Sequence, residues 1–183
     1  MARKYYLQSQ KGFGLLPKIG LFALALIAML LLAIRAMAKR VSSNNVSAIA
    51  QAAIERAMYR AGYSSQMIKW WTAISAFETT YWTSPIFRRA NNLWGMTLAS
   101  RNTTAIGILE DAPEKQAVYP SLDASAEDIV LFMRKRWRYP DNFVTLADLI
   151  RYMKQRNYFT SSEVKYYEGV KSTYLKLYGE KTF

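Results

Sequence analysis

Glu78 has the surroundings in this sequence that most suggest chemistry. It follows an apolar stretch with helical periodicity and precedes the hydroxyl and aromatic side chains of residues 79–84. Carboxylates are rarely buried unless they are paired or used, and packing against apolar groups raises their pKa because it disfavours the charged form. A raised pKa keeps a proton on the group near neutral pH, as a general acid requires. We therefore predict that Glu78 is a general acid.

The composition removes most competing chemistries. The 183-residue chain contains no Cys and no His. It therefore has no Ser-His-Asp or Cys-His nucleophile, no imidazole base and no ordinary zinc site. Carboxylates, tyrosines, lysines and hydroxyls are what remains, and we predict an enzyme without a metal or another cofactor.

The elements that must position Glu78 are predicted to be mostly helices. Apolar residues recur at helical spacing, with Gly62 and Gly179 as C-caps and a capping-box pattern at Thr145 and Asp148. The predicted helices cover residues 47–61, 65–77, 125–137, 145–156 and 162–178. Between Leu93 and Tyr119, short apolar runs separated by polar turns predict a small β-hairpin. The fold class is therefore α+β, mostly helical, with two helical portions flanking a β element and a cleft.

The N-terminal part is predicted to cross a membrane. Residues 19–34 form an uninterrupted apolar run, and residues 35–38 extend it to about the 20 residues that span a bilayer. We predict a basic segment at 1–18, a transmembrane helix at 19–38, a short tether at 39–46 and a folded domain at 47–183. Ala36-Met37-Ala38 also fits a signal-peptidase site, but the long basic region before the run favours a retained anchor in the lipid bilayer.

The basic charge is concentrated around that segment. Residues 1–40 carry seven of the 25 basic residues and no acid, out of a net charge of +12. Flanking charge of this kind favours contact with a membrane surface. The alternative is a tethered protein that holds nucleic acid through phosphate contacts, and we expect no specific nucleic-acid partner.

Four motifs occur in an order that resembles a known family. Residues 78–84 compare with a catalytic Glu followed by Ser-Gly-Trp-Gly-x-Ser, and residues 91–97 with Asn-Asn-Leu-Phe-Gly-Ile-Lys. Residues 119–121 match a Tyr-x-Ser element, and residues 157–160 echo a closing Gly-Tyr-Ala-Thr. The set resembles the glucosaminidase branch (glycoside hydrolase family 73) of the lysozyme superfamily, over about residues 47–178. The chain departs from the family where two glycines are replaced by Thr80 and Trp82.

The resemblance implies a lysozyme-like, two-lobed domain that cleaves the β-1,4 glycan strand of peptidoglycan. Glu78 would be the acid, and a second carboxylate would lie on the β element. Glu110, which directly ends an apolar run, is the first choice and Asp111 the second, while Glu114 lies in the same region. A chain that uses Glu78 alone would instead be a lytic transglycosylase.

Further residues are predicted to bind the substrate. Flat aromatic rings pack against the apolar faces of sugars, and small polar side chains can orient N-acetyl groups or the acid. The predicted substrate-binding residues are Ser84, Asn92, Trp94, Tyr81, Tyr119 and Tyr158.

Together these features predict a membrane-anchored peptidoglycan hydrolase that opens the cell wall locally. Its catalytic domain would face the wall, either from the membrane of a phage virion, where it would aid genome entry, or from a bacterial inner membrane. Its partners would be glycan strands, the bilayer at residues 19–38, and other proteins of a virion or envelope complex. The non-enzymatic alternative is a structural membrane protein whose domain only binds glycan.

Overall fold

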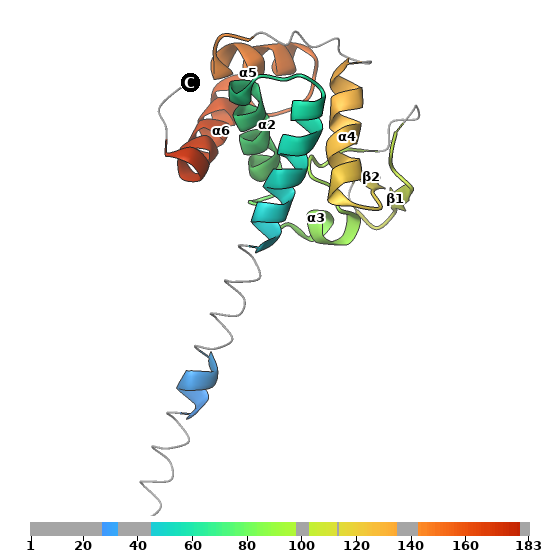
Figure 1. Cartoon of the computed structure of the whole chain (residues 1–183), viewed down its shortest axis with the longest axis vertical. Coiled ribbons are helices and arrows are strands. Elements are labelled where there is room, and N and C mark those ends of the chain that lie inside the picture. Colours follow the sequence, from blue (N-terminus) through green and yellow to red (C-terminus); the bar gives the residue numbers. More distant parts are fainter. Residues whose placement is uncertain (1–26, 33–44, 98–102, 113, 135–142, 180–183) are drawn as a thin grey trace, which may run out of the picture. The chain divides into compact units, whose positions relative to one another are not determined.

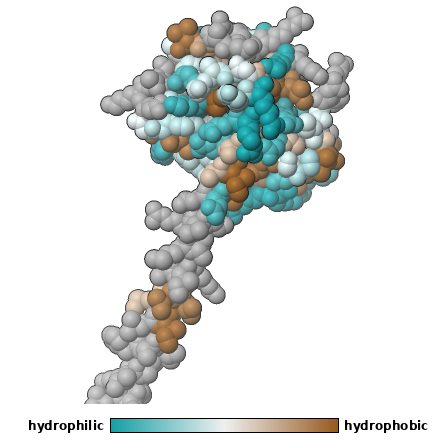
Figure 2. Space-filling model, viewed as in Figure 1, coloured by the Kyte–Doolittle hydropathy of each residue, from teal (hydrophilic) through white to brown (hydrophobic). Residues whose placement is uncertain are grey.

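The computed structural model describes residues 27–32, 45–97, 103–112, 114–134 and 143–179. The chain divides into two units, Met1–Ser42 and Ser43–Phe183. The described residues of the second unit are mostly helical with one two-stranded antiparallel sheet, as predicted for the folded domain (Figure 1). Hydrophilic residues cover much of the face seen in Figure 2, with apolar residues in small separate patches.

The predicted fold class included a transmembrane helix, and that part of the prediction is wrong. Within the described part of the chain, no helix has both the length and the apolar character needed to cross a bilayer. Of the predicted span 19–38, residues 27–32 are described and are helical. The rest of that span lies outside the described residues.

Each labelled helix of the domain begins after a capping side chain, and the helix predicted from residue 125 begins earlier, at Leu122. A first helix covers residues 45–60, and the labelled helices are α2 (Ser65–Glu78), α3 (Pro85–Ala90), α4 (Leu122–Phe132), α5 (Leu146–Gln155) and α6 (Glu163–Tyr178). A Ser or Thr oxygen accepts a backbone N–H at the start of each labelled helix, from Ser64, Ser84, Ser121, Thr145 and Ser162. Helix α3 is the labelled helix that the sequence patterns did not predict.

The predicted hairpin is present between Leu93 and Tyr119. Strand β1 (Gly107–Leu109) pairs with β2 (Gln116–Val118), with Ile108 opposite Ala117. On its other side β2 contacts the 92–97 segment, because the Ala117 N–H donates to the Met96 carbonyl at 2.9 Å. Strand β2 therefore lies between β1 and the 92–97 segment.

Helix α2 is buried over most of its length, and α6 packs closely against it. Nine of its 14 residues are buried, including Trp70 and Trp71. On α6, a Cβ built at Gly169 would lie 2.4 Å from Cε2 of Phe77. Glycine within a helix costs about 1 kcal/mol relative to alanine, but here it lets the two helices approach. Phe77 and Glu78 thereby end α2 directly against α6.

The turn after α2 keeps a left-handed backbone without glycines. Thr80, Tyr81 and Trp82 have φ of 52°, 54° and 57°. Left-handed geometry costs a non-glycine residue about 1–2 kcal/mol. The turn is held by Trp82, which is 1% exposed and whose Nε1–H donates to Ser75 Oγ at 3.0 Å. Burial of the indole ring offsets the strain of the turn.

Candidate active site

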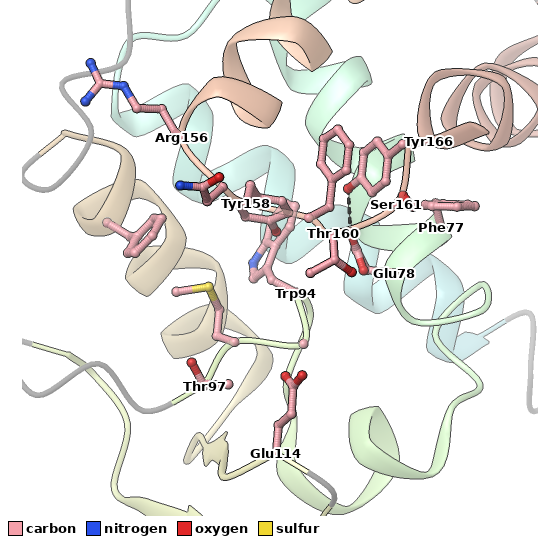
Figure 3. Close-up of a pocket in the computed structure, with 15 residues that line it drawn as sticks. Phe77, Glu78, Trp94, Thr97, Glu114, Arg156, Tyr158, Thr160, Ser161 and Tyr166 are labelled. Atoms are coloured by element: carbon pink, nitrogen blue, oxygen red, sulfur yellow. Dashed lines mark hydrogen bonds between the residues drawn. The ribbon is translucent and has the colours of Figure 1, made fainter. Parts of the chain in front are cut away.

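Glu78 is the last residue of α2 and faces an open cleft of about 700 Å³ (Figure 3). The walls of the cleft come from the end of α2, the 94–97 segment, the hairpin, α4, the 156–161 loop and α6. The lining residues are Phe77, Glu78, Trp94, Gly95, Met96, Thr97, Glu114, Phe132, Arg156, Asn157, Tyr158, Phe159, Thr160, Ser161 and Tyr166. The cleft therefore joins segments that are far apart in sequence.

The Glu78 carboxyl group is half-buried and hydrogen-bonded. The hydroxyl of Tyr166 donates to its Oε1 at 2.5 Å. Burial raises the pKa of Glu78 above its usual value, and the hydrogen bond from Tyr166 lowers that pKa in part. The net direction is upward, which favours the protonated form that a general acid needs. With Oε1 bonded to Tyr166, Oε2 is the oxygen left for the proton and the substrate.

Tyr166 is held between two aromatic rings. Phe159 stacks on it with ring centroids 3.8 Å apart and planes 3° apart, and Phe77 meets it edge-on at 5.2 Å. Tyr166 is 3% exposed. Packing on both sides therefore directs its hydroxyl at Glu78, and Figure 3 shows the resulting hydrogen bond.

Two predicted aromatic residues, Trp94 and Tyr158, line the same cleft. Both meet the buried ring of Trp71 edge-on, at centroid distances of 5.8 Å and 6.4 Å. Burial raises the pKa of the Tyr158 phenol well above its usual value, and the negative charge of Glu78 adds to the rise. Tyr158 therefore stays protonated. The structure brings Glu78, Trp94 and Tyr158 together.

Of the three carboxylates considered on the β element, Glu114 lines the cleft. It is exposed, and it makes no hydrogen bond or ion pair with any residue that the structure describes. Figure 3 shows its carboxylate and that of Glu78 projecting into the same cleft from different elements. Glu114 therefore comes from the right place to be a second acidic group.

The two carboxylates ranked first from the sequence lie elsewhere. Asp111 makes an exposed ion pair with Arg89 of α3, at 2.7 Å, which lowers the pKa of Asp111. Glu110 is exposed in the turn after β1 and is not among the residues that line the cleft. Because β2 separates β1 from the 92–97 segment, the residues that lead into β2 come closest to the cleft.

Asn92 and Ser84 have structural contacts where substrate contacts were predicted. Asn92 is fully buried: its Nδ2 donates to the carbonyls of Met96 and Ala117, and its Oδ1 accepts from the Met96 N–H at 3.0 Å. It therefore ties the 92–97 segment to β2. Ser84 caps α3 by accepting the Phe87 N–H at 3.2 Å.

Tyr119 and Tyr81 also lie outside the residues that line the cleft. Tyr119 is buried and donates to Asp128 Oδ2 at 2.8 Å. Burial raises the pKa of Tyr119, and the nearby Asp128 charge adds to that rise. Tyr81 is half-buried in the left-handed turn, with the Lys176 ammonium 5.4 Å from its ring centroid.

Sequence reasoning missed Tyr166. It lies 88 residues from Glu78, and its spacing with Val170 and Tyr174 on α6 is that of an ordinary buried stripe. The available signal was the phenol itself, since a buried phenol generally needs a partner, but Tyr174 in the same stripe gives the same signal.

The comparisons with known proteins leave the family open. The chain matches no protein family, no curated protein and no solved structure. Among the described residues, no group of three or more acidic side chains is placed to hold a metal ion. A functional argument for this domain therefore rests on the geometry of the cleft.

Proposed function

We propose that the domain is a glycosidase of the glucosaminidase type that cleaves the glycan strands of peptidoglycan. The observation that carries the proposal is Glu78, a half-buried carboxyl group with a raised pKa at the wall of an open, aromatic-lined cleft. This combination of a perturbed acid and a cleft is typical of active sites. The resemblance of the ordered motifs to glucosaminidases supplies the substrate class.

Glu78 would act as the general acid. Its Oε2 would donate a proton to the glycosidic oxygen as the bond to the anomeric carbon breaks. Tyr166 would remain on Oε1 and stabilise the carboxylate that the transfer leaves behind. The same carboxylate can later take a proton back from water.

Glu114 is the candidate for the second carboxylate. From its exposed position at the cleft, it would orient a water molecule or face the positive charge of the oxocarbenium-like transition state. Its place on the hairpin agrees with the place that the resemblance implies for this group.

The cleft lining suits a polysaccharide. The half-buried ring of Tyr158 offers an apolar surface, and Thr160 and Asn157 offer polar groups. Trp94 also lines the cleft but is only 2% exposed. Arg156 lies at the end of the cleft away from Glu78 (Figure 3) and makes no ion pair with any described residue. A cation there would favour an acidic polymer such as peptidoglycan.

A lytic transglycosylase is the second candidate, because Glu78 is half-buried while Glu114 is exposed. In that case the C6 hydroxyl of the sugar, and not water, would attack the anomeric carbon. Glu78 would then serve as acid and base alone.

Mass spectrometry of sacculi digested with the full chain would test both candidates. Reducing GlcNAc ends indicate a glucosaminidase, reducing MurNAc ends a muramidase, and anhydro-MurNAc ends a transglycosylase. Glu78→Gln should abolish release of fragments in each case. Undiminished release by that variant would overturn the proposal, and sacculus binding without turnover by the wild type would favour a glycan-binding protein.

A further inference from the structure

The loop that forms one wall of the cleft is fastened by a single ammonium group. Lys154 Nζ, from the last turn of α5, donates to the carbonyl oxygens of three consecutive residues: Phe159 at 3.4 Å, Thr160 at 3.1 Å and Ser161 at 2.8 Å. The same ammonium lies 5.3 Å from the ring centroid of Phe159. A cation bound to three carbonyls makes charge-assisted hydrogen bonds, which are stronger than neutral ones.

The start of the loop is fixed independently of that lysine. Asn157 takes a left-handed conformation at φ 57°, a geometry that Asn tolerates better than most residues. The Tyr158 N–H donates to the Met153 carbonyl at 3.0 Å. Lys154 therefore acts on residues 159–161, where the loop reaches α6.

Those residues carry the ring that supports Tyr166. Phe159 stacks on Tyr166, and Tyr166 donates to Glu78 Oε1. A continuous set of contacts thus leads from the ammonium to the carboxyl group. Lys154 is not among the residues that line the cleft, so its effect on the acid must pass through these contacts.

We propose that Lys154 is a positioning residue for Glu78: by binding the carbonyls of residues 159–161 it seats Phe159 on Tyr166 and keeps the Tyr166 hydroxyl on Oε1. The inference rests on the proposed function, since it assigns this lysine a role in that reaction. Without the lysine, Phe159 loses its fixed place and Tyr166 loses one of its two ring supports. The protonated oxygen of Glu78 is then no longer kept towards the cleft.

The titratable groups around Glu78 come from three elements. Tyr166 belongs to α6, Tyr158 to the loop, and Glu114 to the hairpin across the cleft. The hydrogen bond from Tyr166 lowers the pKa of Glu78, so its loss raises that pKa. For a general acid, activity falls as pH rises through its pKa. Loss of the Tyr166 contact therefore moves this fall to higher pH.

The test compares Lys154→Met with Lys165→Met, which removes the same charge from an exposed position on α6. In the full chain, Lys154→Met should lower kcat/KM on sacculi by about 10- to 100-fold, the scale on which misplaced catalytic groups act. The basic limb of its pH profile should move to higher pH, as in Tyr166→Phe. Lys165→Met should match the wild type. The double variant Lys154→Met/Tyr166→Phe should be no slower than Tyr166→Phe alone, since coupled residues are not additive.

Phe159→Leu breaks the ring stack and leaves the lysine in place, so it tests the same contacts even if Lys154→Met does not fold. It should shift the pH profile in the same direction as Lys154→Met. An unchanged pH profile in these variants, or additive losses in the double variant, would overturn the inference. NMR titration of the Glu78 carboxyl carbon measures the same pKa change without turnover. If the variants raise the Glu78 pKa in the NMR titration but the wild type does not cleave sacculi, the result counts against the glycosidase. If the wild type is active but the variants leave the Glu78 pKa unchanged, the result counts against the role of Lys154.

Discussion

The hydroxyl of Tyr166 donates to Oε1 of Glu78 at 2.5 Å, joining the first turn of α6 to the last residue of α2. This contact stabilises the charged carboxylate, while burial of the same group disfavours it, and burial is the larger effect. The balance leaves Glu78 able to hold a proton and able to release it. Both properties are needed in a group that donates a proton and then takes one back.

The raised pKa of Glu78 predicts a pH-dependent gain in stability for Glu78→Gln. A carboxyl group whose pKa is higher in the folded chain binds more protons there, so its contribution to stability falls as pH rises from about 4.5 through the folded pKa. Above that pKa the folded chain carries the full penalty of a half-buried charge. The amide has no charge and can still accept the hydrogen bond from Tyr166.

Urea unfolding at several pH values would measure this effect. Glu78→Gln should be more stable than the wild type at pH 8, and the difference should shrink towards pH 4. Glu114→Gln, at an exposed carboxylate, is the matched control and should change stability little at either pH. A Glu78→Gln variant that is less stable than the wild type at pH 8 would contradict the assignment of burial as the larger effect.

Replacing each carboxylate of the hairpin by the corresponding amide would identify the second acidic group. Glu114→Gln should lower the rate of fragment release from sacculi by about 10²- to 10⁴-fold, the usual contribution of acid–base groups. Glu110→Gln and Asp111→Asn should stay near the wild-type rate. Asp111→Asn loses an exposed ion pair with Arg89, and such pairs contribute about 0–1 kcal/mol. Normal activity in Glu114→Gln would favour a reaction that uses Glu78 alone.

The hairpin also shows what the sequence could not predict. Short apolar runs separated by polar turns predicted a hairpin between Leu93 and Tyr119, and it is present. The choice among its carboxylates depended on which strand lies beside the 92–97 segment, and that is a tertiary contact. Glu110 follows β1, the outer strand, whereas Glu114 leads into β2. Local patterns carry no information on that order.

Helices were predictable for a different reason. The cap at Thr145, predicted from its spacing with Asp148, acts through neighbours in the chain, so its effect can be read from local sequence. Helix α3 was missed because six residues are too few to show an apolar period. The hydrogen bond between Tyr166 and Glu78 joins residues from two helices and was beyond any local pattern.

The left-handed turn predicts that glycine stabilises the domain at position 80. Thr80 has φ 52° and an exposed side chain. Thr80→Gly should remove about 1–2 kcal/mol of strain, while greater freedom of the unfolded chain takes back about 0.5–1 kcal/mol. The expected net gain is between about 0 and about 1.5 kcal/mol in the free energy of unfolding.

Thr80→Ala is the matched control, because it removes the same side chain and keeps the strain. Thermal unfolding of both variants should place Thr80→Gly above the wild type and Thr80→Ala at or below it. Equal melting temperatures for the two variants would show that the turn stores no strain at this residue.

The close approach of α6 to α2 predicts that alanine is harmful at position 169. A Cβ there would lie 2.4 Å from Cε2 and 2.6 Å from Cζ of Phe77, so the ring must move. Overpacking of this kind costs about 1–3 kcal/mol, which exceeds the gain of about 1 kcal/mol in helix propensity. Ser172→Ala, at an exposed position of the same helix, should be neutral or slightly stabilising.

Because Phe77 also packs against Tyr166, Gly169→Ala should lower activity more than its loss of stability explains. Denaturant unfolding and fragment release, measured on the same samples, would separate the two effects, and normal activity in a destabilised Gly169→Ala would show that the Phe77 ring does not support the acid.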